Sequence, residues 1–370
     1  MKRAKPTIAF FGSSLVSAYW NGAATYYRGI IKYLHRLGYH VTFYEPDAFG
    51  RQSNLDIDPP HWAEVFVYAN SQTAVEKAVK RASKADILIK ASGVGVFDAY
   101  LEKALLEVRR NGQMIVFWDV DAPATLDSVM SKPDNPFRYL IPEYDYILTY
   151  GGGKPVVDAY KSLNAQECIP VYNALDPETH YTVAPDPEFN CDLAFLGNRL
   201  PDREKRVYEF FIHVAQALPD KKFIMGGSGW DDVSLPANIK YIGHVFTADH
   251  NAFNSSPLAV LNISRESMAS YGFSPATRVF EAAGAGACMI TDYWEGIDEF
   301  FIPGKEIFVA RSGEEVTAIL SKLDKNKAMQ IGNAAKSRVL KDHTYHIRAL
   351  QVDQIFTHHY AYANDNMRAV

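Results

Sequence analysis

Short apolar runs alternate with amphipathic stretches along the first half of the chain. The runs have the length of strands, and the stretches between them place apolar residues at helical spacing, as in Ile30, Ile31 and Leu34. The predicted strands are 7–11, 40–45, 63–69, 86–90, 113–118 and 144–150, and the predicted helices are 22–37, 73–83 and 97–110. Because strands that alternate with helices form βαβ units, we expect an α/β domain with a doubly wound parallel sheet.

The same alternation restarts after residue 190. The predicted strands here are 191–197, 221–227, 238–245, 257–263, 287–292 and 306–310, and the predicted helical segments are 203–217, 275–284 and 313–364. Four prolines and no sustained period between residues 170 and 190 indicate an interdomain linker. We therefore expect two doubly wound domains that face each other across a cleft. The expected divisions are a first domain, a linker, a second domain and a C-terminal helix, at 1–172, 173–190, 191–345 and 346–370.

Composition and charge narrow the classes of function. The 370 residues are 48% hydrophobic and 22% charged, which excludes a largely disordered chain. A formal net charge of −5 gives no basic footprint for nucleic acid, so no nucleic-acid partner is expected. No apolar run reaches the roughly 20 residues that span a bilayer, and 7–11 is interpreted as a strand, not as part of a signal peptide. The three cysteines are far apart, which indicates neither a disulfide framework nor a zinc spacing and predicts a cytoplasmic location.

The segment with the clearest chemical pattern is 274–286. Ser274 followed by a proline predicts the N-cap and first turn of a helix, whose free N–H groups and dipole favour an anion. Thr277 and Arg278 fall in the same turn and suit a diphosphate. Glu281, one turn further on, is placed to accept both hydroxyls of a ribose. The alternative is a capped, buried helix with an exposed arginine, but hydroxyl, cation and acid within two turns favour the phosphate site.

This segment also carries a family resemblance. SPATRVFEAAGAGACMITDYWEGIDEFF, with GHV before it and PGKEI after it, resembles the C-terminal half of GT-B glycosyltransferases, and the chain looks like the CgeB-like spore-maturation family. The resemblance extends to FLGNRLPDR (195–203), LNISRESM (261–268), WDVDAPAT (118–125), YDYILTYGGG (144–153) and VYNALDPETH (171–180). It covers most of residues 110–310.

The resemblance implies that two Rossmann-like domains transfer a sugar from a nucleotide-sugar donor to an acceptor hydroxyl, with no metal and no other cofactor. The C-terminal domain would hold the nucleotide, and Glu281 matches the residue that binds the ribose hydroxyls. Many retaining members carry a second glutamate eight positions earlier, where this chain has Phe273, so the stereochemical outcome stays open. By the same analogy, the C-terminal helix crosses back onto the first domain. The acceptor would be a glycan, a small molecule or a protein.

Further donor-side candidates follow the predicted strands of the second half. They are glycines that leave space for a nucleotide and polar or cationic side chains that suit a phosphate, a sugar or a base edge: Gly197, Asn198, Arg199, Arg203, Gly227, His244 and Arg265. Each has a plainer alternative, since a lone arginine is more often a surface cation and a lone histidine is more often structural.

In the first half, Asp119 and Asp121 follow the predicted strand 113–118 and are candidate general bases for an inverting transfer. The alternative for Asp121 is a helix cap. Glycines and polar residues in nearby loops are expected to give clearance near the acceptor: Gly12, Ser13, Asn21, Gly22 and Gly152.

Two other functions fit the same expected fold. A nucleotide-sugar epimerase would consume the donor without any acceptor. A non-catalytic, two-lobed nucleotide-sugar-binding protein would need no general base, so Asp119→Ala and Asp121→Ala would leave its function intact.

Overall fold

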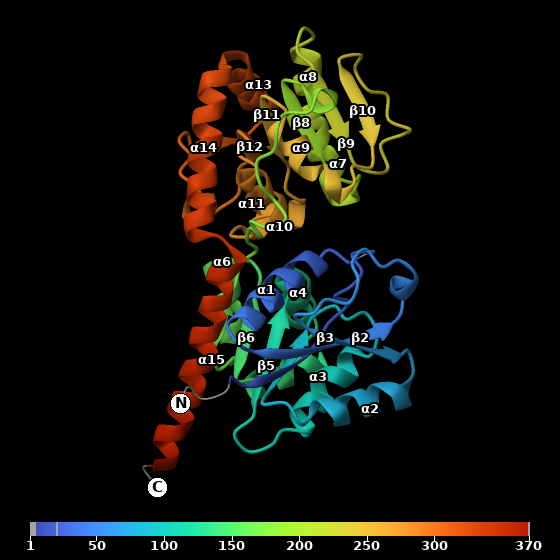
Figure 1. The fold of residues 1–370 in the computed structure, drawn as a ribbon, viewed down its shortest axis with the longest axis vertical. Coiled ribbons are helices and arrows are strands. Elements are labelled where there is room, and N and C mark those ends of the chain that lie inside the picture. Colours follow the sequence, from blue (N-terminus) through green and yellow to red (C-terminus); the bar gives the residue numbers. More distant parts are fainter. Residues whose placement is uncertain (1–4, 20, 369–370) are drawn as a thin grey trace. The chain divides into compact units, whose positions relative to one another are not determined.

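The computed structural model describes residues 5–19 and 21–368, with side chains up to residue 361 (Figure 1). The chain divides into two compact units, here called the first unit (Met1–Tyr172 with Tyr345–Val370) and the second unit (Asn173–Thr344). Each unit is built on its own parallel sheet. Among the described helices, none is both long and apolar enough to span a membrane.

The first unit contains a seven-stranded sheet in the order β3-β2-β1-β4-β5-β6-β7, and all its strand pairs are parallel. The strands are β1 (Thr7–Phe11), β2 (His40–Asp47), β3 (Glu64–Ala69), β4 (Ile87–Ala91), β5 (Met114–Asp119), β6 (Tyr146–Thr149) and β7 (Cys168–Pro170). The helices are α1 (Ala24–Arg36), α2 (Gln72–Ala82), α3 (Asp98–Glu107), α4 (Ala122–Ser131), α5 (Pro136–Leu140), α6 (Gly153–Ser162) and α15 (Tyr345–Arg368). The strand order reverses between β1 and β4, as in a doubly wound sheet.

The second unit repeats this plan with six parallel strands in the order β10-β9-β8-β11-β12-β13. The strands are β8 (Leu193–Leu196), β9 (Phe223–Gly226), β10 (Ile239–Gly243), β11 (Ala259–Asn262), β12 (Met289–Asp292) and β13 (Phe308–Ala310). The helices are α7 (Pro201–Val207), α8 (His213–Ala217), α9 (His250–Ser255), α10 (Glu266–Tyr271), α11 (Thr277–Gly284), α12 (Ile297–Phe300), α13 (Gly313–Lys322) and α14 (Lys325–Asp342). Here the order reverses between β8 and β11.

Both sheets are covered on their two faces, which explains why the strands stand out in the sequence. Every residue of β4, β5, β8, β9, β11 and β12 is buried. Parallel strands buried on both faces form continuous apolar runs instead of alternating patterns. The alternation of such runs with helical stretches therefore located nearly every element of the two sheets.

Residues 173–190 pack within the second unit. The backbone N–H of Leu175 donates to the carbonyl of His343 (2.8 Å), and that of Tyr181 donates to the Asn251 side chain (3.1 Å). The segment carries one short 3₁₀ turn, Pro187–Phe189. It is thus an ordered strip along the second unit in this structure.

Helix α15 packs on the first unit, beside α1 (Figure 1). The Tyr345 ring lies so close to Gly29 that a side chain at Gly29 would overlap it. The rings of Tyr39 and Phe356 meet edge to face, with centroids 5.9 Å apart. The last helix of the chain therefore completes the hydrophobic core of the unit in which the chain began.

Candidate functional site

A pocket of about 320 Å³ lies at the carboxyl ends of four strands of the second unit. Its polar and glycine lining comes from the ends of β8, β9, β10 and β11 and from the starts of α7, α9 and α11: Gly197, Asn198, Arg203, Gly227, His244, His250, Asn262 and Arg278. Strands β8 and β11 flank the point where the strand order reverses. Open α/β sheets bind their ligands at this edge and at this reversal point.

Two arginines give the pocket its charge. Among the residues that the structure describes, Arg203 and Arg278 form no ion pair and donate no side-chain hydrogen bond. Nε of Arg203 and Nη1 of Arg278 are buried without a partner. Burial lowers the pKa of both guanidinium groups, and the charge of Arg278 lowers the pKa of Arg203 further. Two partly buried cations without a carboxylate partner are costly unless an anion occupies the pocket.

Glycines form the wall beside these arginines. A side chain at Gly197 would overlap the Arg203 guanidinium, so the glycine lets Arg203 reach the pocket. Gly227 has a φ of +115°, and a Cβ there would overlap the carbonyl of Gly197. Its N–H donates to the carbonyl of Gly243 at 2.7 Å. Three neighbouring strand ends therefore meet through backbone alone.

The start of α11 corrects the predicted helix start. The helix begins at Thr277, not at the Ser274–Pro275 pair, and its N-cap residue is Ala276. Ser274 is buried, and its Oγ donates to the carbonyl of Gly272 (2.9 Å). The preceding residues form a loop because Phe273 has a φ of +47° and donates its N–H to the carbonyl of Glu295. Ser274 therefore caps nothing, whereas Arg278 stays in the first turn.

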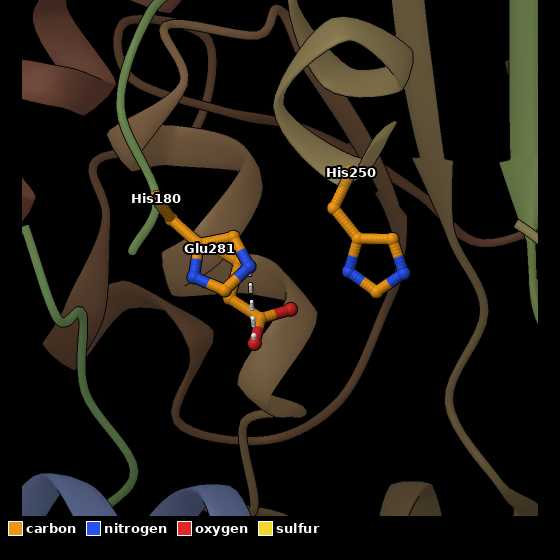
Figure 2. Close-up of side chains that lie close together, drawn as sticks. All are labelled: His180, His250 and Glu281. Carbon is orange, nitrogen blue, oxygen red and sulfur yellow. Dashed lines mark ion pairs between the residues drawn. The ribbon is translucent and has the colours of Figure 1, made fainter. Parts of the chain in front are cut away.

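Glu281 lies one turn after Arg278, outside the residues that line the pocket. Its Oε1 is 3.7 Å from Nε2 of His180 (Figure 2). His250, which does line the pocket, faces the same carboxylate. Burial, followed by the charge of Arg278, lowers the pKa of His250. Neither histidine was a candidate in the sequence analysis. His180 ends the VYNALDPETH motif, whereas nothing in the sequence around His250 signals its role.

Two predicted donor-side arginines are already paired. Arg199 binds Glu204 (2.6 Å) and Asp232 (2.8 Å). Nε of Arg265 donates to Asp202 at 2.8 Å, in an exposed setting. Neither arginine lines the pocket, and Thr277 does not line it either. The structure thus brings together Gly197, Asn198, Arg203, Gly227, His244 and Arg278 out of the predicted donor set.

In the first unit, the structure separates the two candidate bases. Asp119 is fully buried at the end of β5, and its Oδ1 accepts from Ser92 Oγ (2.7 Å), Thr125 Oγ1 (3.0 Å) and the N–H of Asp121 (3.0 Å). Its Oδ2 accepts from the Tyr160 hydroxyl (2.5 Å). Burial raises the pKa of Asp119. With both oxygens occupied and no exposure, Asp119 cannot reach an acceptor in this structure. Asp121 is exposed at the N-cap position of α4 and makes no cap hydrogen bond.

Two of the residues expected near an acceptor, Ser13 and Asn21, hold a loop together. Ser13 Oγ donates to Asn21 Oδ1 (2.8 Å), and Asn21 Nδ2 donates to the carbonyls of Ser14 and Ser17. Both side chains are buried, and their place near an acceptor stays a prediction.

The glycines in this group differ. A side chain at Gly12 would overlap the ring of Phe43, so Gly12 serves packing. Gly152 has a φ of +89° and is the N-cap of α6. Gly22 is exposed, with open space around its Cα. Of the three, only Gly22 has open space around it, and its place near an acceptor stays a prediction.

Comparison with known proteins agrees with this architecture. Residues 203–354 match a family model described as glycosyl transferase-like. Sucrose-phosphate synthase from Thermosynechococcus elongatus superimposes with a TM-score of 0.71 at 12% identity, over 97% of this chain and 100% of that chain. HepE of Anabaena in complex with UDP-glucose superimposes with a TM-score of 0.67 at 14% identity, over 95% of this chain and 100% of that chain. An α-glucosyltransferase in complex with UDP and DNA superimposes with a TM-score of 0.67 at 13% identity, over 95% of this chain and 100% of that chain. No curated protein sequence matches the chain.

The chain has the GT-B fold. The predicted fold class of two Rossmann-like domains is confirmed, and the match over residues 203–354 supports the predicted glycosyltransferase. Membership of the CgeB-like family stays a prediction.

Proposed function

We propose that this protein is a glycosyltransferase that moves a sugar from a nucleoside diphosphate sugar to an acceptor hydroxyl. The observation that carries the proposal is the pair of unpaired arginines, Arg203 and Arg278, in the pocket of the second unit. The GT-B fold and the glycosyl transferase-like match over 203–354 support it. HepE, a structural neighbour, is complexed with UDP-glucose.

The donor's diphosphate would lie between the two guanidinium groups. Arg278 lies in the first turn of α11, where the first N–H groups have no partner within the helix and the dipole favours negative charge. The resemblance assigns the ribose hydroxyls to Glu281 and a base edge to the backbone near His244. Gly197 and Gly227 leave room for the nucleotide because neither carries a side chain.

The chemistry follows from this placement. When the bond between the sugar and the terminal phosphate breaks, its electron pair goes to the phosphate oxygen. Arg203 and Arg278 stabilise that added charge, so they favour the departure of the nucleoside diphosphate. Two fixed cations supply the charge that a metal ion would otherwise supply, and we therefore propose metal-independent transfer.

On the acceptor side, the proposed general base is Asp121. If the configuration inverts, an acceptor hydroxyl must lose a proton as its oxygen bonds to the sugar. Asp121 is exposed and free of a cap contact, so it is the better of the two candidate bases. Membership of the CgeB-like family and a cytoplasmic location complete the proposal, and the three free, buried cysteines are consistent with a reducing compartment.

A thermal-shift panel with UDP, dTDP, GDP, ADP and CMP tests the donor site. A nucleotide at 100 times its dissociation constant adds about 2.7 kcal/mol of stability, which raises the melting temperature by several degrees. We expect one diphosphate to stabilise the wild type. If none does, the nucleotide-sugar proposal fails.

Product analysis then separates the three candidate functions. Incubation of the matching sugar nucleotide without an acceptor yields a new sugar nucleotide only for an epimerase. A binding protein consumes no donor with or without acceptors. A glycosyltransferase releases the nucleoside diphosphate and forms a glycosylated product when the acceptor is present.

A further inference from the structure

Three potential metal ligands converge in the second unit from segments far apart in sequence. His180 lies in the strip 173–190, His250 begins α9, and Glu281 lies in α11. One ligand atom from each lies within 4.8 Å of the others (Figure 2). Among the described residues, this is the one group of three or more His, Cys, Asp or Glu side chains close enough to share an ion.

One ring nitrogen of His180 lacks a hydrogen-bond partner. His180 is only 6% exposed, and its Nε2 is buried without a hydrogen bond. Its other ring nitrogen, Nδ1, is 3.0 Å from Thr179 Oγ1, a contact that fixes the ring so that Nε2 faces Glu281. Contacts of this kind orient metal-binding histidines in known sites.

The spacing suits two ligands of one ion better than a direct bond. At 3.7 Å, Nε2 of His180 and Oε1 of Glu281 are too far apart for a hydrogen bond. In a tetrahedral zinc site with bonds of about 2.0–2.2 Å, neighbouring ligand atoms lie about 3.3–3.6 Å apart. The ligand atoms lie within 4.8 Å of one another, so the widest pair must approach by up to about 1.2–1.5 Å around an ion.

We propose that His180, His250 and Glu281 bind one divalent transition-metal ion, with zinc as the best match. Two imidazoles and one carboxylate form a known zinc ligand set, and the fourth position is left to water. Magnesium and calcium prefer oxygen ligands, so the two nitrogens disfavour them. The ion ties the strip 173–190 to α9 and α11, and it supports the pocket wall that His250 forms.

This inference goes beyond the proposed function and does not rest on it. The ion would lie beside Glu281, which does not line the pocket, whereas the diphosphate contacts are proposed for Arg203 and Arg278. A carboxylate has two oxygens, so Glu281 can hold the ion with one and a ribose hydroxyl with the other.

Cobalt titration of the tag-free, EDTA-stripped full chain tests the site. Co²⁺ in a tetrahedral site absorbs visible light strongly, and we expect one equivalent to bind and Zn²⁺ to displace it. His250→Ala and Glu281→Gln should each weaken binding at least tenfold. His213→Ala, which removes an exposed histidine of α8, should bind as the wild type does.

A second measurement separates lost binding from lost folding. Zn²⁺ should raise the melting temperature of the wild type and of His213→Ala, EDTA should reverse the rise, and His250→Ala should fold without the response. The proposal is overturned if the wild type binds no stoichiometric cobalt. It is also overturned if folded His250→Ala and Glu281→Gln bind it as tightly as the wild type.

Discussion

Arg203 and Arg278 reach the same pocket from different helices, and neither has an acidic partner among the described residues. The charge of Arg278 lowers the pKa of Arg203, so the two guanidinium groups repel each other. Such a pair destabilises the empty protein and stabilises a bound dianion. Removal of one arginine should therefore affect ligand affinity and protein stability in opposite directions.

Arg278→Ala should reduce stabilisation by the nucleoside diphosphate that the wild type binds, from about 2.7 to about 0.9 kcal/mol at 100 times the wild-type Kd. Loss of one charge-assisted contact is worth about 2 kcal/mol, or roughly a 30-fold rise in Kd. The free energy of unfolding without ligand should stay unchanged or rise, since one buried charge is gone. Isothermal titration calorimetry measures the first effect and urea denaturation the second.

Arg199→Ala is the matched control for this substitution. Arg199 was also predicted to bind phosphate, but its charge is neutralised by Glu204 and Asp232. The Kd of Arg199→Ala for the nucleoside diphosphate should differ from that of the wild type by less than about twofold. An equal loss of nucleotide affinity in Arg199→Ala and Arg278→Ala would contradict the assignment of the pocket as the donor site.

Asp121→Ala should keep the fold and lose activity. The side chain is exposed and makes no cap contact, so the free energy of unfolding should change by about 0.5 kcal/mol or less. If Asp121 is the base of an inverting transfer, kcat should fall by about 10²–10⁴ with the donor Kd unchanged. Steady-state kinetics with an identified acceptor measures this, and full activity in the variant would remove Asp121 from the mechanism.

Asp119→Asn should change how stability depends on pH. Burial raises the pKa of Asp119 in the folded state, so the folded protein holds this proton more tightly than the unfolded chain does. The stability that protonated Asp119 contributes is fully present below the pKa of the unfolded chain, about 4, and is lost as the pH rises through the pKa of the folded state. Relative to Asp119→Asn, the wild type should therefore lose stability as the pH rises from about 4 towards neutrality. Urea denaturation of both proteins across that pH range checks this prediction. The same change of unfolding free energy with pH in both proteins would contradict it.

The sequence located most strands because each is buried on both faces, and burial leaves an apolar run that can be read directly. The sequence also indicated Arg278, which lies in the first turn of a helix, and Gly227, which follows a strand. It misplaced the start of α11, since the deciding contact joins Phe273 to the distant Glu295. Likewise Asp119 is saturated by Ser92 and Tyr160, which a local pattern cannot reveal.

Partners far apart in sequence also decided the fate of the side-chain candidates. Arg199 looked available until the fold brought it next to Asp232, 33 positions away. His250 gave no local signal, because its environment comes from Arg278 and Glu281 in another helix. Local patterns thus predict which strand ends face a ligand, whereas tertiary contacts decide which side chains there remain unpaired.

Gly227→Ala should be far more harmful than Gly243→Ala, although both glycines have positive φ values of +115° and +67°. A Cβ at Gly243 meets nothing within 4 Å, so that variant should lose only about 1 kcal/mol from its left-handed backbone. A Cβ at Gly227 would overlap the carbonyl of Gly197. The wall must then shift, which should cost at least about 2–3 kcal/mol and weaken nucleotide binding. Urea denaturation and calorimetry compare the two variants. Equal stabilities and equal affinities would show that the close approach of Gly197 and Gly227 does not shape the pocket.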